Sequence, residues 1–503
     1  MFSRMKTSKG VILNSVANIF GKMWSMLSII IFMPLYIKYM GEEQYGLVSF
    51  FTTFQTLLLL MNGGFNTSIK REFAIKDENK TDDRKYHLLR STEFLFLILS
   101  VLVISLVSSF SSIIATKWLN IGTLNKHYVV QSIDLIGVTI VLQVFSSLYL
   151  GCLQGLEQQI TANISQSLFY LIRNLGALLI VKYVSPDVRL FFICYIISEI
   201  VFIIVNRSFV LHCISHAAKW HICDFIILKS IFTYTMGIFG ISVISVFNAQ
   251  LDKVLISKYM NLSDITYYSI ASSVGQVPLL LVNAIAIAFF PKLVQALSRN
   301  DKQVAPMFKK CSSLFSLVSI PITCFMSVAM YHLILLWQMK PETAQYTFVP
   351  AIMLTIANSL YCLQVTADNC LLAEKNTNIL IYKNLGSMAL SLTTMVILIP
   401  KYGLLGGALS YLCVAFFCWL IYGGYVHRYY TQDSFIKWAI LFVVIPTLIS
   451  VVISVGSSLV INQYNINSIV FVSIMVFLGV LTLLLLIKCY SKKLQGFNDI
   501  QEE

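Results

Sequence analysis

Apolar segments of about 20 residues follow one another along almost the whole chain, with only short polar breaks between them. A helix of that length crosses the hydrocarbon core of a bilayer, whereas barrel strands would be about half as long and would alternate in polarity. The composition agrees, because 57% of the residues are hydrophobic and only 12% are charged, against about a quarter charged in soluble domains. The sequence therefore predicts an all-α integral membrane protein.

Hydropathy predicts about fourteen transmembrane helices. They fall at residues 11–37, 44–69, 88–114, 129–154, 160–183, 187–211, 226–257, 265–290, 309–337, 345–372, 377–399, 404–426, 435–461 and 467–489. An even number puts both termini on one side, and the Lys and Arg residues gathered near both ends and in the breaks on that side make it cytoplasmic. This placement beside an anionic inner leaflet also accounts for the net charge of +13 without a nucleic-acid partner.

A repeat divides the chain into two halves. Lys38-Tyr39-Met40 closes the first span and Lys258-Tyr259-Met260 closes the seventh, 220 positions later. Lys182-Tyr183 follows the fifth span and Lys401-Tyr402 follows the eleventh, 219 positions later. Because six spans separate equivalent points, the halves are predicted to be parallel repeats. The predicted organisation is an N-terminal six-helix lobe (1–211), a cytoplasmic linker (212–225), a C-terminal six-helix lobe (226–430), and two extra helices with a cytoplasmic tail (431–503).

No cofactor and no metal site are predicted. The predicted linker carries His and Cys at short spacing, but the spacing matches no tetrahedral zinc pattern; the residues are His212, Cys213, His216, His221 and Cys223. The chain has no Gly-rich phosphate loop and no nucleophile elbow. No loop on the outer side is long enough for an active site of its own, which disfavours an enzyme.

Cations inside predicted spans are the first candidates for a functional site. A charge at the bilayer centre costs roughly 2.5 to 3.5 kcal/mol on insertion scales, so each one present is a functional candidate. Arg173 lies about halfway along the fifth span and Lys22 about a third of the way into the first. Lys253 lies in the seventh span, and Lys383 lies near the cytoplasmic end of the eleventh, where its ammonium could simply snorkel to the interface. A wet path lined with such cations suits an anionic head group, and guanidinium suits phosphate oxygens best.

Three carboxylates lie in the same kind of environment. Glu199 is in the middle of the sixth span, Asp252 in the outer half of the seventh, and Asp368 toward the inner end of the tenth. Two interpretations remain open for them: charge pairing with the cations, for which Glu199 and Arg173 on consecutive helices are the best candidates, or binding of a coupling H+ or Na+. Asp252 lies near enough to water to be partly a boundary feature.

Several short motifs, taken in their order, resemble the multidrug/oligosaccharidyl-lipid/polysaccharide (MOP) exporter superfamily, and within it the O-antigen repeat-unit flippases of the Wzx type. The motifs are Gly41, Tyr45 and Gly46; Asp252-Lys253; Tyr267-Tyr268-Ser269; Phe290-Pro291; Ile399-Pro400-Lys401-Tyr402-Gly403; and Gly406-Gly407-Ala408. The resemblance covers nearly the whole chain. One departure is Thr266, where relatives often carry Gly.

This resemblance implies two six-helix lobes in a V around a central cavity that opens alternately to the two sides. It implies a transporter, not an enzyme, in the bacterial inner membrane. The implied cargo is an undecaprenyl-diphosphate-linked oligosaccharide, with membrane lipids, a polysaccharide polymerase and a chain-length regulator as further partners. A peptidoglycan-precursor flippase and a multidrug exporter of the same superfamily remain alternatives, and a membrane polysaccharide polymerase or ligase is the alternative of a different class.

Overall fold

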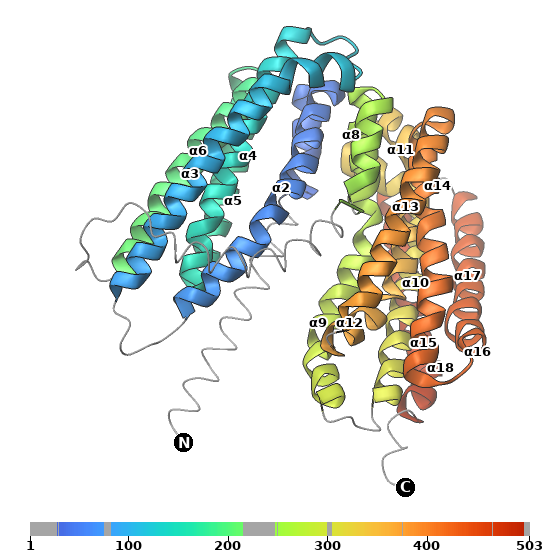
Figure 1. Ribbon diagram of the computed structural model, residues 1–503. Coiled ribbons are helices and arrows are strands. Elements are labelled where there is room, and N and C mark those ends of the chain that lie inside the picture. Colours follow the sequence, from blue (N-terminus) through green and yellow to red (C-terminus); the bar gives the residue numbers. More distant parts are fainter. Residues whose placement is uncertain are drawn as a thin grey trace. The chain divides into compact units, whose positions relative to one another are not determined.

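A computed structural model of the chain describes residues 28, 30–74, 82–214, 247–248, 250–298, 304–374, 376–464 and 466–496. The regular elements of this part are helices, and one isolated bridge pairs Asn120 with Asn261 (Figure 1). The described residues therefore confirm the predicted all-α class. Ten of the described helices are long and apolar enough to cross a membrane, or eleven if α8 and α9 form one bent span. Most of the first and seventh predicted spans lies outside the described residues, so the count of fourteen stays a prediction.

The chain divides into two compact units. Unit 1 comprises Met1–Gln250 with Met260–Thr266, and unit 2 comprises Leu251–Tyr259 with Tyr267–Glu503. The helices of unit 1 are Ile30–Met40, α2 (Glu42–Ala74), α3 (Asp82–Ile113) with the π-helix η1 (Ile114–Trp118), α4 (Lys126–Gly155), α5 (Gln159–Tyr183) and α6 (Val188–Cys213). The predicted linker and the start of the predicted second lobe lie almost wholly outside the described residues, so those two limits stay predictions.

α8 begins with residues that belong to unit 1. Unit 2 contains the remaining helices. They are a helical stretch at 250–259, α8 (Leu262–Gly275), α9 (Val277–Ser298), α10 (Val304–Gln338), α11 (Pro341–Cys362), α12 (Val365–Glu374), α13 (Thr377–Tyr402), α14 (Leu404–Cys418), η2 (Trp419–Gly423), α15 (Gly424–Thr431), α16 (Phe435–Ala439), η3 (Ile440–Val444), α17 (Ile445–Asn462) and α18 (Ser468–Gly496). The two extra C-terminal spans, α16–α17 and α18, pack within this unit.

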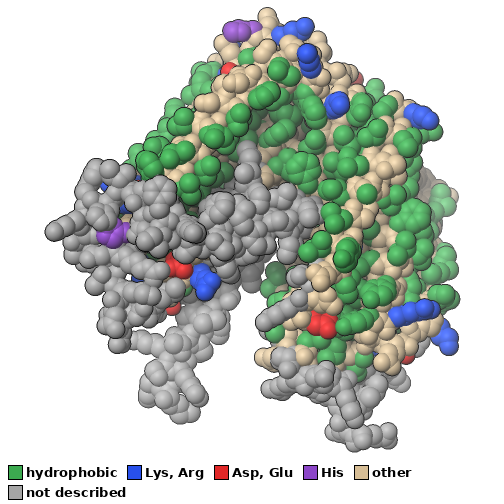
Figure 2. All heavy atoms as spheres, in the orientation of Figure 1, with side chains coloured by type: hydrophobic (Ala, Val, Ile, Leu, Met, Phe, Trp, Pro, Cys, Tyr) green, Lys and Arg blue, Asp and Glu red, His purple; other side chains and the backbone are tan. Residues whose placement is uncertain are grey.

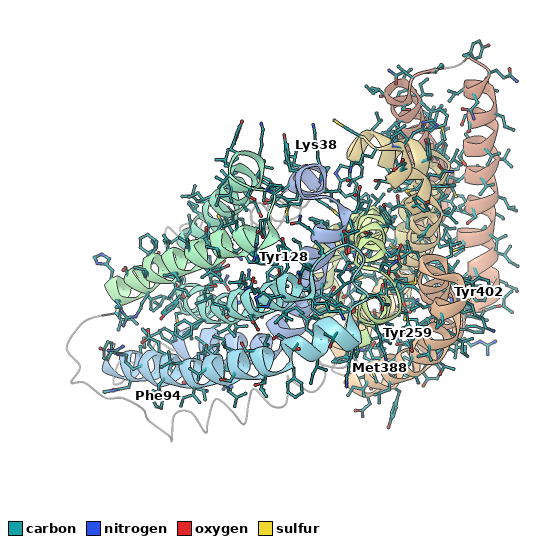
Figure 3. The ribbon with its side chains drawn as sticks, turned by 90° about the horizontal axis from the view of Figure 1, so that it is seen from above. Lys38, Phe94, Tyr128, Tyr259, Met388 and Tyr402 are labelled. Carbon is teal, nitrogen blue, oxygen red and sulfur yellow. The ribbon has the colours of Figure 1, made fainter. Side chains whose placement is uncertain are left out.

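Helix boundaries follow the predicted repeat. α5 ends at Tyr183 and α13 at Tyr402, which is 219 positions later, and α4 and α12 end at Gly155 and Glu374, again 219 positions apart. The repeated Lys-Tyr pair also has the same geometry in both units, because the ammonium of Lys38 lies 5.8 Å from the ring of Tyr39 and that of Lys258 lies 5.6 Å from the ring of Tyr259. Lys38 and Tyr259 are labelled in Figure 3.

Each unit is built around one central helix. In unit 1, α4 packs against α2, α3 and α6, and 67% of its most apolar stretch is buried, against 11% for α3. α3 therefore presents most of its surface outward, as Phe94 does at the edge of the unit in Figure 3. In unit 2 the repeat counterpart of α3 is α10, and it is 67% buried because α17 and α18 cover it.

Small side chains on α10 allow the two extra C-terminal spans to pack closely against it. Ser313 and Ser316 of α10 are fully buried; the indole Nε1 of Trp438 donates to the Ser313 hydroxyl over 3.0 Å, and the Ser316 hydroxyl donates to the carbonyl of Phe442. Serine at helix contacts inside a membrane serves both close packing and interhelical hydrogen bonding. The first extra span is thus anchored on α10 by two polar contacts, and α18 is anchored by the 3.0 Å contact between His332 of α10 and the Ser468 hydroxyl.

Helix breaks fall at glycine and proline. Gly41 and Gly403 have positive φ angles of 83° and 58°, and each separates two helices, which explains why glycine stands at these positions of the resemblance motifs. α8 and α9 bend by 41° at a break just before Pro278, since proline removes a backbone donor from the helix. The described part of the face in Figure 2 is dominated by hydrophobic side chains, as expected for helices in contact with lipid.

Candidate functional site

The central polar feature of unit 1 is an ion pair between two helices. Arg173 lies in the middle of α5, and its Nη1 is 3.0 Å from Oε1 of Glu199 on α6. Both side chains are buried, with 7% of Arg173 and 1% of Glu199 exposed. The residues that hydropathy placed at mid-span are therefore direct partners. Whether either binds cargo or a coupling ion stays a prediction.

Aromatic rings surround the guanidinium. The Arg173 Cζ atom lies 4.5 Å from the ring centre of Tyr195, 4.9 Å from that of Tyr170 and 5.2 Å from that of Phe169. A cation that has lost its water gains from the negative face of such rings. The Nε of Arg173 has no hydrogen-bond partner among the described residues. The guanidinium thus keeps a donor available for a further acceptor.

A polar network extends from this pair toward other helices of unit 1. The hydroxyl of Tyr195 donates to the side-chain oxygen of Asn174 over 2.7 Å, and the hydroxyl of Tyr36 donates to the Asn174 carbonyl over 2.8 Å. On the other side, Gln143 and Ser146 of α4 lie beside the Glu199 carboxylate. The network joins the helix Ile30–Met40 to α4, α5 and α6. A change at the ion pair would therefore alter contacts of four helices.

A second charge cluster in unit 1 was not predicted. Glu93 of α3 accepts from the hydroxyl of Tyr149 at 2.8 Å, from Nε of Arg207 at 2.9 Å and from Nη1 of Arg90 at 3.1 Å. Glu93 falls inside the predicted third span, so its position alone would have marked it as a candidate. The cluster joins α3, α4 and α6 through two arginines and a tyrosine around one carboxylate.

In unit 2, Asp368 and Lys383 form an ion pair in which 34% of the Asp368 side chain is exposed. The ammonium of Lys383 lies 2.7 Å and 2.8 Å from the two carboxylate oxygens of Asp368, and the hydroxyl of Tyr422 donates to the same carboxylate over 2.5 Å. Tyr422 lies in the π-helix η2, and irregular turns of this kind often occur at functional sites. Only 10% of the Lys383 side chain is exposed. The ammonium is therefore paired within the unit and does not snorkel outward.

Asp252 lies in the helical stretch 250–259 and is also buried, with 5% of its surface exposed. The hydroxyl of Tyr268 on α8 donates to Oδ2 of Asp252 over 2.8 Å, and the backbone N–H of Lys253 donates to Oδ1. A tyrosine from the next helix therefore covers the carboxylate, and the position of Asp252 near the membrane boundary stays a prediction. Lys253 is half-buried beside it.

The remaining predicted positions lie outside the described residues. These are Lys22, and the linker residues His216, His221 and Cys223; His212 and Cys213 form the exposed end of α6. In the described part of the chain, no group of three or more His, Cys, Asp or Glu could hold a metal ion. Within each unit the structure thus pairs a cation with a carboxylate: Arg173 with Glu199, and Lys383 with Asp368.

Comparison with known families shows to which family the chain belongs. The sequence model of the family described as "Polysaccharide biosynthesis protein" matches residues 8–297, which is more than half of the 503 residues. The chain belongs to this family. The matched region contains Arg173, Glu199 and Asp252, whereas Asp368 and Lys383 lie beyond it. A comparison with curated proteins found no match.

Solved structures with a similar fold belong to transporters. The fold of this chain is similar to that of the lipid II flippase MurJ in an inward closed conformation, with a TM-score of 0.73, 17% identity, and coverage of 96% of this chain and 99% of that chain. A multidrug resistance MATE family transporter of the MOP superfamily has a TM-score of 0.66 at 10% identity, covering 81% and 94%. A MOP superfamily transporter from Pyrococcus furiosus has a TM-score of 0.54 at 13% identity, covering 84% and 96%. The predicted MOP fold is thereby confirmed.

Proposed function

We propose that this protein is a flippase that moves an undecaprenyl-diphosphate-linked oligosaccharide, such as an O-antigen repeat unit, from the cytoplasmic to the outer leaflet of the bacterial inner membrane. Its family membership and its MOP transporter fold support a membrane exporter linked to polysaccharide synthesis. The observation that carries the choice of an anionic cargo is the buried guanidinium of Arg173, which keeps a free donor at Nε. Guanidinium matches the geometry of phosphate oxygens better than any other side chain.

The proposed role of Arg173 requires an exchange of partners. Glu199 neutralises the guanidinium while no cargo is bound. A diphosphate that reaches Arg173 would replace part of this interaction, and a proton bound by Glu199 at the same stage would remove the competing charge. This is how a proton gradient would be coupled to the movement of the cargo. In unit 2, Lys383 and Asp368 form the equivalent kind of exchangeable pair.

The test of the cargo proposal is complementation of a strain that lacks the gene. Arg173→Ala should abolish or strongly reduce surface polysaccharide, and Arg173→Lys should restore only part of it, because an ammonium lacks the two-pronged geometry. The matched control is Arg428→Lys, which alters an exposed arginine in the last turn of α15. Normal polysaccharide with Arg173→Ala, at equal protein level in the membrane, would contradict the proposal.

Coupling has its own test in proteoliposomes. Transport of a lipid-linked oligosaccharide should depend on a proton or sodium gradient, and Glu199→Gln should remove the dependence on the proton gradient. Equal transport by the original protein with and without both gradients would exclude coupling. Cysteine labelling from each side would test the proposed cytoplasmic position of both termini.

A peptidoglycan-precursor flippase is the second candidate. The observation that favours it is the similarity in fold to the lipid II flippase MurJ, which extends over 96% of this chain. Both cargoes carry a lipid diphosphate, so the Arg173 site suits either. The two candidates differ in the consequence of deletion, because loss of viability indicates the peptidoglycan precursor and loss of surface polysaccharide alone indicates the oligosaccharide. Efflux assays would reveal a multidrug exporter, and an altered chain-length distribution with intact translocation would indicate a polymerase or ligase.

A further inference from the structure

Unit 1 contains a cavity away from the Arg173 site. It has a volume of about 560 Å³ and lies between α3, α4 and α6. Its wall includes Leu135 and Val138 of α4 and Ile193 of α6. Exposed apolar side chains of α3 and α6 continue beyond it, such as Leu106 with 49% and Ile197 with 58% of their surface exposed. Because such faces lie against lipid, the cavity is open to acyl chains.

One end of this cavity is polar. Arg189 binds Asp187 through Nε and through Nη2, the latter at 2.7 Å from Oδ2, and donates from Nη1 to the side-chain oxygen of Gln131 over 2.7 Å. Asp187 also accepts from the hydroxyl of Tyr128 over 2.9 Å. The charge of Asp187 is therefore fully matched within the protein. Arg189 has five N–H donors, so two remain for a further acceptor.

Asp134 is the carboxylate at this end of the cavity that lacks a hydrogen-bond partner at one of its oxygens, within the part of the chain that the structure describes. It lies in the third turn of α4, lines the cavity, and has its Oδ1 buried without a hydrogen-bond partner among the described residues. A carboxylate oxygen without a partner away from water is unfavourable. Two carboxylates and one guanidinium line the cavity, which leaves one negative charge without compensation. The missing partner is therefore a cationic hydrogen-bond donor.

We propose that this cavity holds one phospholipid with a primary amine in its head group, such as phosphatidylethanolamine. The ammonium would bind Asp134, the phosphate would accept the remaining donors of Arg189, and an acyl chain would follow Leu135, Val138 and Ile193. An anionic phospholipid offers no cation to Asp134. A choline head group carries a charge but no N–H donor, so it satisfies the carboxylate less well. The lipid is a resident of the lobe and is distinct from the transported cargo.

Native mass spectrometry of the full-length protein tests this proposal. After delipidation, the protein is titrated with phosphatidylethanolamine, phosphatidylcholine and phosphatidylglycerol. We expect one tightly bound phosphatidylethanolamine, and Asp134→Asn should weaken its binding about tenfold while leaving phosphatidylglycerol binding unchanged. Equal affinity of Asp134→Asn and the original protein for phosphatidylethanolamine would overturn the proposal, as would equally tight binding of phosphatidylglycerol.

A second variant tests the cavity without touching the charges. Val138→Trp fills the space next to the proposed acyl chain, and the matched control Ile197→Trp places the same indole on the exposed face of α6 outside the cavity lining. Only Val138→Trp should lose the bound phosphatidylethanolamine. If both variants retain it, or if both lose it equally, the lipid does not occupy this cavity. The result does not depend on the transported cargo. The lipid proposal and the proposed flippase function can therefore fail independently of each other.

Discussion

Arg173 and Glu199 are separated by 26 positions in the chain, yet their side chains meet at 3.0 Å in the interior of unit 1, with almost no contact with solvent. α5 and α6 are consecutive and pack side by side, which brings the middle of one helix next to the middle of the other. The attraction between the two charges offsets the hydration that each one loses on burial. The pair is therefore a stability element as well as a candidate for cargo binding.

The first prediction separates these two roles. Arg173→Met leaves Glu199 buried without a partner and should cost about 3–5 kcal/mol of stability, whereas the double variant Arg173→Met/Glu199→Gln should regain most of it. Thermal unfolding in detergent measures the order of the melting temperatures. If the double variant melts as low as Arg173→Met, the ion pair is not the reason for the loss. A double variant that is stable but inactive would assign the pair to transport.

The second prediction concerns the pair in unit 2. Lys383→Met should lower the melting temperature more than Tyr422→Phe, because the first leaves a charge without its counterion and the second removes one hydrogen bond worth about 1.5–3 kcal/mol to a charged group. Adding Asp368→Asn to Lys383→Met should recover part of the loss. The reverse order of the two single variants would show that Tyr422, and not Lys383, holds Asp368 in place.

The third prediction concerns the glycine motif at the start of α14. A Cβ atom at Gly406 would lie 2.1 Å from the carbonyl oxygen of Leu398, which is backbone and cannot move aside easily. Gly406→Ala should therefore reduce folded protein in the membrane strongly. Gly386→Ala is the matched control on the neighbouring helix α13, since nothing lies within 4 Å of its Cβ, and it should stabilise the helix by up to about 1 kcal/mol. Equal folded yields of the two variants would refute this packing argument.

The fourth prediction is a pH dependence at the start of α2. Burial alone would raise the pKa of Glu43, but hydrogen bonds from Thr123, Gly122 and Leu124 outweigh it, so the pKa is lowered from its ordinary value. A lowered pKa in the folded state means that this carboxylate contributes stability above its unfolded pKa, and that the contribution is lost as the pH falls through the folded pKa.

The measurement compares Glu43→Gln with the original protein over a range of pH. The original protein should melt higher at neutral pH, and the difference should shrink below about pH 4, where the unfolded state binds a proton that the folded state does not yet bind. Glu342→Gln, at an exposed position in the first turn of α11, serves as the control for loss of one carboxylate. A difference in melting temperature that is constant from neutral to acidic pH would mean that the charge of Glu43 does not contribute to stability.

Hydropathy and motif spacing were sufficient to predict the membrane class, the position of the helices and the repeat. Each of the twelve predicted spans that fall within the described residues coincides with a helix or with a helix broken once or twice. The reason is that hydropathy and helix-breaking residues act over one or two turns, so a local pattern is enough. Local patterns also marked Arg173, Glu199, Asp368 and Lys383 as unusual, because a charge in an apolar segment is visible without any knowledge of its neighbours.

The contacts that these residues make depend on how the helices pack. Asp368 and Lys383 are 15 positions apart on different helices, and their contact depends on how α12 and α13 pack. The same holds for Tyr268, which covers Asp252, and for α17 and α18, which bury α10 although its counterpart α3 stays exposed. Asp134 stood in a predicted span like the others, but its missing partner and the cavity beside it became apparent only from the packing of three helices. Side-chain pairing depends on the distances between helices, and the linear pattern of apolar residues contains no measure of those distances.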